Sequence, residues 1–87
     1  MPKIFQYLAP MVNGNPAPRA IDSDCAAEMD LVDPLDPRRP RYCGATTESR
    51  PEWGNAYGGC SRPVGHLGVH VCGDRRRGAV YARWIVV

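Results

Sequence analysis

The sequence predicts a small α+β or mostly β fold: a loop-rich single domain stabilised by zinc, with a C-terminal β-hairpin and one short helix. Three observations lead to this prediction. The chain has 87 residues, and chains of this size bury only about 60–65% of their unfolded surface, so a metal or covalent link adds needed stability. Nine glycines and nine prolines favour turns over long regular elements. Cysteines and histidines recur at short intervals in the second half of the chain, as in many zinc sites.

The first strand and the first linker lie in residues 1–40. Residues 4–8 are apolar and aromatic with little polar interruption, so we expect a short strand there. Residues 10–18 contain three prolines and an Asn-Gly pair, which predicts a turn followed by an extended linker.

A short acidic helix is expected over residues 25–32. Residues 22–24 offer capping side chains, and acids in a first turn suit the helix dipole. Cys25, Met29 and Val32 have the i, i+4, i+7 spacing of one apolar face, so Cys25 is interpreted as a core residue and not as a ligand. Three prolines at 34, 37 and 40 end the helix.

The C-terminal hairpin is the clearest local prediction. Residues 69–72 form one strand, residues 73–78 a turn, and residues 79–87 the returning strand. The N-terminal strand is expected to pair with residues 79–86. The chain is thus divided into an N-terminal part, 1–40, and a zinc-binding module, 41–87, within one compact domain.

The pattern C-x16-C-x5-H-x3-H starts at Cys43 and predicts a zinc site. Thiolate and imidazole are ligands that Zn²⁺ prefers, and four of them close a tetrahedral, structural site. The preferred ligands are Cys43, Cys60, His66 and His70. Cys72 is an alternative to one histidine, because residues two apart on a strand share a face.

Two other interpretations of the cysteines stay open. A disulfide could join Cys43 to Cys60, or Cys60 to Cys72, and sequence alone does not decide connectivity. The thiols could also be buried without a ligand, with the histidines only hydrogen-bonded.

The spacing excludes two familiar zinc classes. Five residues between Cys60 and His66 leave no room for the recognition helix of a C2H2 finger. The segment between His66 and His70 lacks the glutamate of a zinc protease. No acid lies between Cys60 and His70 to act as a general base. We therefore expect a protein that is not an enzyme and has no small-molecule substrate.

Charge is divided unevenly along the chain. Residues 22–36 carry six acids and no base, whereas residues 37–87 carry nine arginines and three acids. The acidic segment could neutralise arginines within the fold. Alternatively, the arginines at the predicted hairpin tip could contact phosphates together with other arginines of the second half. The tip residues are Arg75, Arg76 and Arg77, and the others are Arg38, Arg39, Arg41 and Arg62. A solvated turn is the simpler interpretation of the tip.

Compartment and partner follow from weaker signals. No apolar run approaches the roughly 20 residues of a membrane span, and the first residues lack a secretory pattern. We expect a cytoplasmic protein whose cysteines bind metal. If the cysteines were oxidised to disulfides, we would instead expect an exported protein or a component of a virion. Trp53 is the aromatic expected at a contact surface.

The second half of the chain resembles short zinc-binding proteins of actinobacteria and their bacteriophages. The resemblance is carried by residues 41–45 (Arg-Tyr-Cys-Gly-Ala), by residues 60–70 with their Cys, Gly-His and Gly-x-His positions, and by Trp84. It implies a small zinc module, often phage-encoded and mostly of unassigned function, and it carries over no catalytic residue. Together with the charge pattern, it leads us to expect a binding protein for a host factor or a phage assembly. A small nucleic-acid-binding regulator is the alternative.

Overall fold

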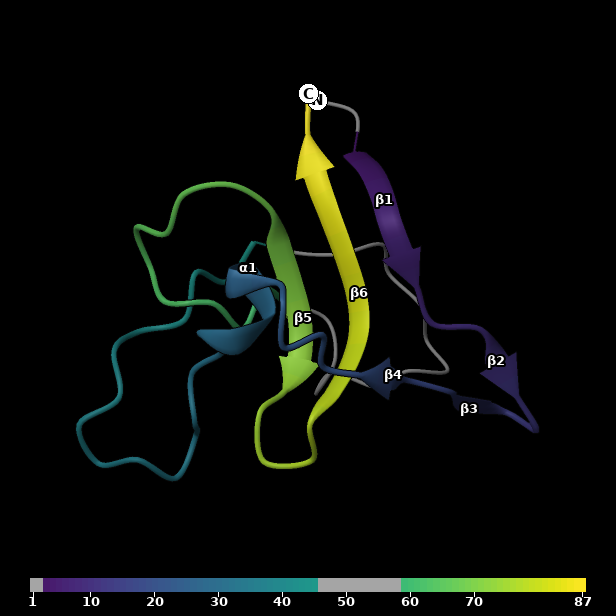
Figure 1. Ribbon diagram of the computed structural model, residues 1–87, viewed down its shortest axis with the longest axis horizontal. Coiled ribbons are helices and arrows are strands. Elements are labelled where there is room, and N and C mark those ends of the chain that lie inside the picture. The colour runs from purple at the N-terminus through teal and green to yellow at the C-terminus, as the bar shows by residue number, and fades with distance from the viewer. Residues whose placement is uncertain (1–2, 46–58) are drawn as a thin grey trace.

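The computed structural model describes residues 3–45 and 59–87, and strand β6 (Ala79–Val86) is its central element. Strand β6 pairs antiparallel with β5 (His70–Asp74) along one edge. Its other edge pairs first with β1 (Lys3–Leu8) and then with the two-residue strand β4 (Arg19–Ala20), as Figure 1 shows. Both halves of the sequence therefore contribute strands to one sheet.

The two main strand predictions are confirmed. The hairpin of β5 and β6 lies within one to two residues of the expected bounds, and its turn includes the three arginines at 75–77. The N-terminal strand pairs with β6 from Lys3 opposite Val86 to Leu8 opposite Ala82. Since strands dominate and the one helix in the described part of the chain is short, the predicted α+β or mostly β class is also confirmed.

Apolar side chains pack on both faces of this sheet. Trp84, Ala82 and Cys72 belong to one cluster, which also includes Cys60. Leu31, Val71 and Val80 form the other. The register of β5 and β6 shifts between Cys72 and Gly73; such a bulge lets neighbouring residues turn to the same face. Tyr81 and Ala82 accordingly lie in the same cluster.

Residues 10–18 form more than a linker. Strands β2 (Met11–Val12) and β3 (Asn15–Pro16) pair as a small hairpin. Asn13 and Gly14 both have positive φ, 51° and 78°, as a two-residue hairpin turn requires. The chain then returns to β6 through β4, a pairing that the sequence analysis did not predict.

Helix α1 (Ala26–Met29) has one turn, so the prediction of about two turns over residues 25–32 was wrong. The residue that precedes it, Cys25, caps no backbone amide with its side chain. The chain leaves the helix because Leu31 is fully buried against the sheet and the Val32 amide donates to the carbonyl of Ser61 (2.8 Å). Tertiary contacts thus outweigh local helix propensity.

The predicted apolar face of the helix was also wrong. Met29 is 51% exposed, whereas Glu28 is fully buried. The carboxylate of Glu28 accepts two 2.6 Å hydrogen bonds from Arg19 and one of 2.7 Å from Arg83. Burial opposes ionisation of Glu28, but the bonds from Arg19, the Asp22 amide and Arg83 outweigh it and lower its pKa to about 2. Helix α1 is therefore held to β4 and β6 by charge.

Gly73 lies where these layers approach most closely. A Cβ added there would lie 2.6 Å from the carbonyl oxygen of Ala79 and 2.9 Å from Cδ1 of Leu31. The glycine therefore allows Leu31 to pack directly on the hairpin. Within the described residues, no helix has the length and apolar character needed to span a bilayer.

Candidate metal centre

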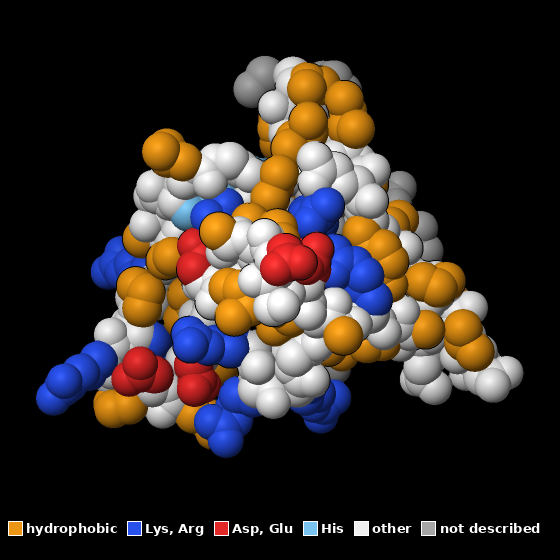
Figure 2. Space-filling model, in the orientation of Figure 1, with side chains coloured by type: hydrophobic (Ala, Val, Ile, Leu, Met, Phe, Trp, Pro, Cys, Tyr) orange, Lys and Arg blue, Asp and Glu red, His pale blue; other side chains and the backbone are white. Residues whose placement is uncertain are grey.

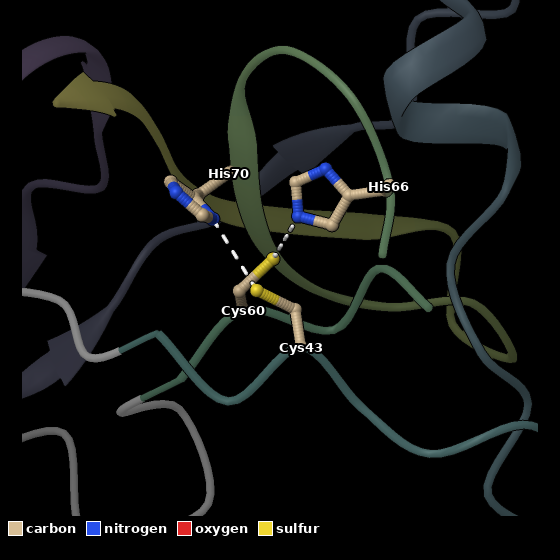
Figure 3. Close-up of side chains that lie close together, drawn as sticks. All are labelled: Cys43, Cys60, His66 and His70. Carbon is tan, nitrogen blue, oxygen red and sulfur yellow. Dashed lines mark hydrogen bonds between the residues drawn. The ribbon is translucent and has the colours of Figure 1, made fainter. Parts of the chain in front are cut away.

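Four side chains converge beside the sheet on the face that carries Trp84. One ligand atom from each of Cys43, Cys60, His66 and His70 lies within 4.8 Å of the other three. In Figure 3 both sulfurs and both imidazoles point toward one another across a small central space. These are the four residues preferred as ligands in the sequence analysis.

The separations fit a tetrahedral zinc ion. Cys43 Sγ lies 3.5 Å from His70 Nδ1, and Cys60 Sγ lies 3.5 Å from His66 Nε2. Zn–S bonds of about 2.3 Å and Zn–N bonds of about 2.0–2.1 Å place two tetrahedral ligands about 3.5–3.6 Å apart. The four residues could therefore hold a metal ion, and these two sulfur–nitrogen distances fit tetrahedral zinc.

Backbone pairing places the two cysteines side by side. The Cys43 amide donates to the Arg62 carbonyl (2.8 Å), and the Cys60 amide donates to the Ala45 carbonyl (2.8 Å). Tyr42 and Pro63 form an antiparallel bridge that extends this short ladder. Two segments far apart in sequence are thus joined next to the site.

A tight turn presents His66. The His66 amide donates to the Pro63 carbonyl (3.1 Å). Gly65 and Gly68, on either side of His66, both have φ of +84°, a conformation that costs other residues about 1–2 kcal/mol. The segment around His66 is therefore a turn and not a helix.

Arg62 holds that turn from inside. Its side chain is nearly buried, and Nη1 donates to the carbonyls of Leu67 (2.7 Å) and Val69 (2.8 Å). Nε and Nη2 donate to the two carboxylate oxygens of Asp30, at 2.9 and 3.0 Å. Arg62 is therefore not part of the basic surface, and the prediction that grouped it with the exposed arginines was wrong. The sequence around Arg62 contains no pattern that would predict its hydrogen bonds to the turn that carries His66.

His70 reaches the site from β5. It lies opposite Trp84 in the ladder, and their rings stack with centroids 5.4 Å apart and an interplanar angle of 27°. Cys72 is two residues further along and is outside the four-residue group. Successive same-face positions on a strand are separated by about 6.5–7 Å, which places Cys72 beyond the four-residue group. Cys72 is buried in the core, opposite Ala82 in the ladder.

The protonation preferences of these groups have clear causes. Burial raises the pKa of the Cys60 thiol, and the nearby Cys43 adds to this, while bonds from the backbone amides of Arg62 and Val71 act in the opposite direction. Burial, reinforced by His66 and Arg62, lowers the pKa of His70 and favours its neutral form, which is the form that binds metal. A bound cation would favour the Cys60 thiolate.

Cys72 and Cys25 have different environments. Burial raises the pKa of Cys72 to about 12, which favours a neutral thiol in the core. Cys25 is half-buried on the other face, where Arg83 donates to its sulfur (3.4 Å). None of the four cysteines forms a disulfide in the structure.

The remaining predicted contact residues are distributed differently. Arg75, Arg76 and Arg77 are exposed at the tip of the β5–β6 hairpin, with Arg76 3.7 Å from Asp33 and Arg77 3.6 Å from Asp74. The acidic segment therefore pairs with arginines inside and outside the core, as one interpretation of its charge predicted. Trp53 lies outside the described residues.

Comparisons of the chain with protein-family models, curated proteins and solved structures find no match. The resemblance to actinobacterial and phage proteins therefore stays a prediction, and the geometry of the cluster is the basis for a function.

Proposed function

We propose that this chain is a non-enzymatic binding protein whose fold is stabilised by one Zn²⁺ ion held by Cys43, Cys60, His66 and His70. The observation that carries this proposal is the set of four soft ligand atoms within 4.8 Å of one another. A metal in that set would join the ladder around Cys43 to β5 and reinforce the hydrogen bond from the Ser61 amide to the Val71 carbonyl (2.7 Å).

The ligand number argues for a structural ion. Catalytic zinc sites keep three protein ligands and leave a fourth position for water or substrate. Here two thiols and two imidazoles supply all four positions, and the group includes no carboxylate to act as a general base. The chemistry of the site therefore supports binding and stability over catalysis.

A protein partner is favoured by the surface next to the ion. Leu67 and Val64, on either side of His66, are 88% and 60% exposed. The turn that carries them is held by Arg62 and would be fixed further by the metal. Apolar side chains on a rigid, exposed turn are typical of protein contacts. A host factor or a phage assembly as that partner, a phage origin and a cytoplasmic location all stay predictions.

Binding of nucleic acid is the second candidate. It is favoured by the exposed arginines at 75–77 and at 38–39. The carboxylates of Asp33, Asp36 and Asp74 lie among them, and they weaken the field that a phosphate backbone requires. A protein partner therefore remains the first proposal.

Metal content and stability test the zinc site. Protein purified without added metal should contain one zinc per chain by elemental mass spectrometry. Cys43→Ser should lose the zinc and the cooperative thermal transition, because metal binding supplies much of the folding free energy of such modules. The matched variant Cys72→Ser should keep both. Zinc loss in Cys72→Ser but not in Cys43→Ser would contradict the ligand assignment.

A further inference from the structure

A pocket opens between the metal-site ladder and the β5–β6 turn. Its volume is about 470 Å³, within the range of about 300–1,000 Å³ usual for ligand sites. Val32, Pro34 and Tyr42 supply the apolar wall, Ser61 adds a hydroxyl, and the charged side consists of Arg75, Arg77 and Asp74. The site is distinct from the metal centre, although Cys60 belongs to both.

Arg75 is oriented by the fold. Its Nη1 donates to the carbonyl of Leu31 (3.2 Å), which is a fully buried residue. That bond uses one of the five N–H groups of the guanidinium, and it fixes the direction of the others at the pocket. Arg77 is anchored more loosely, with Nε 3.6 Å from Asp74 Oδ2. The two cations, with Asp74 beside them, therefore lie on one side of a largely apolar pocket.

The surrounding surface is mixed in charge. Figure 2 shows basic and acidic side chains alternating over the lower left of the molecule, where Figure 1 places the β5–β6 turn and the loop of residues 33–40. Five arginines and three aspartates lie in these two segments: Arg38, Arg39, Arg75, Arg76, Arg77, Asp33, Asp36 and Asp74. A continuous polyanion would meet repulsion at each aspartate. A short ligand with an apolar group and one or two carboxylates would meet only Asp74, whose charge is partly neutralised by Arg77 at 3.6 Å.

We propose that this pocket binds an acidic peptide segment of the partner protein, with an apolar side chain against Tyr42 and Val32 and carboxylates on Arg75 and Arg77. This deepens the proposed function and rests on it, because it names the chemistry of the partner. Arginine is suited to the role, since its planar fork binds a carboxylate through two parallel hydrogen bonds. The apolar wall supplies contact area that charge alone would not.

The test uses the zinc-loaded full chain and three probes: the peptide (Glu-Leu)3, its neutral counterpart (Gln-Leu)3, and a ten-nucleotide oligothymidylate. Binding is followed by amide chemical shifts in two-dimensional NMR spectra. We expect (Glu-Leu)3 to shift the amides of Val32, Tyr42 and Arg75. The neutral peptide should bind about tenfold more weakly or worse, since charge-assisted bonds are lost.

Matched variants separate the pocket from general charge. Arg75→Gln with Arg77→Gln should weaken (Glu-Leu)3 binding about tenfold. Arg38→Gln with Arg39→Gln removes the same charge outside the pocket and should leave the affinity within about twofold. Equal losses in the two pairs, or no shifts at the pocket amides, would overturn the proposal. Tighter binding of the oligothymidylate at those amides would overturn it in favour of nucleic acid.

Zinc content and thermal unfolding are measured on every sample of this experiment. A variant that keeps one zinc per chain and a cooperative transition is folded, so its loss of peptide binding reports on the pocket. If the wild-type chain holds no zinc, the proposed function fails on that measurement, independently of the peptide result.

Discussion

The guanidinium of Arg62 and the carboxylate of Asp30 form a two-point ion pair, with distances of 2.9 and 3.0 Å. Arg62 also donates to the carbonyls of Leu67 and Val69 in the turn that presents His66. The pKa of Arg62 is raised mainly by the hydrogen bonds that it donates to Asp30. The acidic segment after helix α1 is thus linked, through one side chain, to the geometry of the metal site.

Replacement of Arg62 by lysine should loosen the metal-binding turn. A lysine ammonium is a point charge and cannot serve both Asp30 and two carbonyl oxygens in the fixed geometry of a guanidinium. We expect zinc affinity to fall by about tenfold, as for other residues that orient metal ligands. Competition with a chromophoric chelator measures the change.

The control for this variant is Arg41→Lys. Arg41 is exposed and close in sequence to Cys43, so Arg41→Lys makes the same substitution near the same site. Its zinc affinity should equal that of the wild type. If Arg62→Lys binds zinc as tightly as Arg41→Lys does, Arg62 does not position the turn.

Gly65→Ala should speed the release of zinc. Gly65 has φ of +84° and Gly14 has φ of +78°, and a Cβ would meet nothing within 4 Å at either position. Alanine therefore introduces similar backbone strain at both, about 1 kcal/mol or more. Only Gly65 adjoins a ligand, so only Gly65→Ala should raise the rate of zinc transfer to excess chelator, by about fivefold.

Gly14→Ala is the matched control, because its turn in the β2–β3 hairpin is outside the metal-binding group. Both variants should lower the melting temperature. Equal acceleration of zinc release in the two would mean that the ion leaves through global unfolding, and it would contradict a local role for the turn.

Local patterns predicted the hairpin and the first strand, and the spacing of cysteines and histidines singled out the four residues that the structure brings together. An apolar run rich in β-branched and aromatic residues predicts a strand such as β6, and the glycines around His66 predict a turn. Glu28 shows the limit of this reasoning. Its burial depends on Arg19 and Arg83, which lie 9 and 55 residues away, and helical periodicity carries no information about either. Arg62 was misassigned for the same reason, since Asp30 is 32 residues distant.

Glu28→Gln should destabilise the fold in a pH-dependent manner. The folded-state pKa of Glu28 is lowered from 4.5 to about 2, so its stabilisation is fully present above pH 4.5 and is lost as the pH falls toward 2. At pH 7 we expect the variant to be less stable by about 3 kcal/mol, because two partly buried arginines lose their anion. Urea unfolding of both proteins measures this difference in free energy.

The difference between wild type and Glu28→Gln should narrow between pH 4.5 and 2. Acid also releases zinc, so the two proteins are compared only at pH values at which both still hold one zinc per chain. Asp24→Asn removes an exposed carboxylate from the same segment and should change stability little. A difference between wild type and Glu28→Gln that stays constant over this pH range would show that the carboxylate is not held ionised by its arginines.

Metal binding should change the fluorescence of Trp84. Its buried ring stacks on His70 with centroids 5.4 Å apart. In the variant Trp53→Phe, Trp84 is the only tryptophan left. Titration of the metal-free variant with Co²⁺ should therefore quench the Trp84 emission as the visible absorption of a tetrahedral thiolate site increases. Both signals should saturate at one ion per chain.

Addition of Cys72→Ser should leave the emission and the absorption signals unchanged. His70→Ala should weaken cobalt binding, and the quenching should no longer follow the visible absorption. Visible absorption that needs Cys72 but not His70 would identify Cys72 as the fourth ligand.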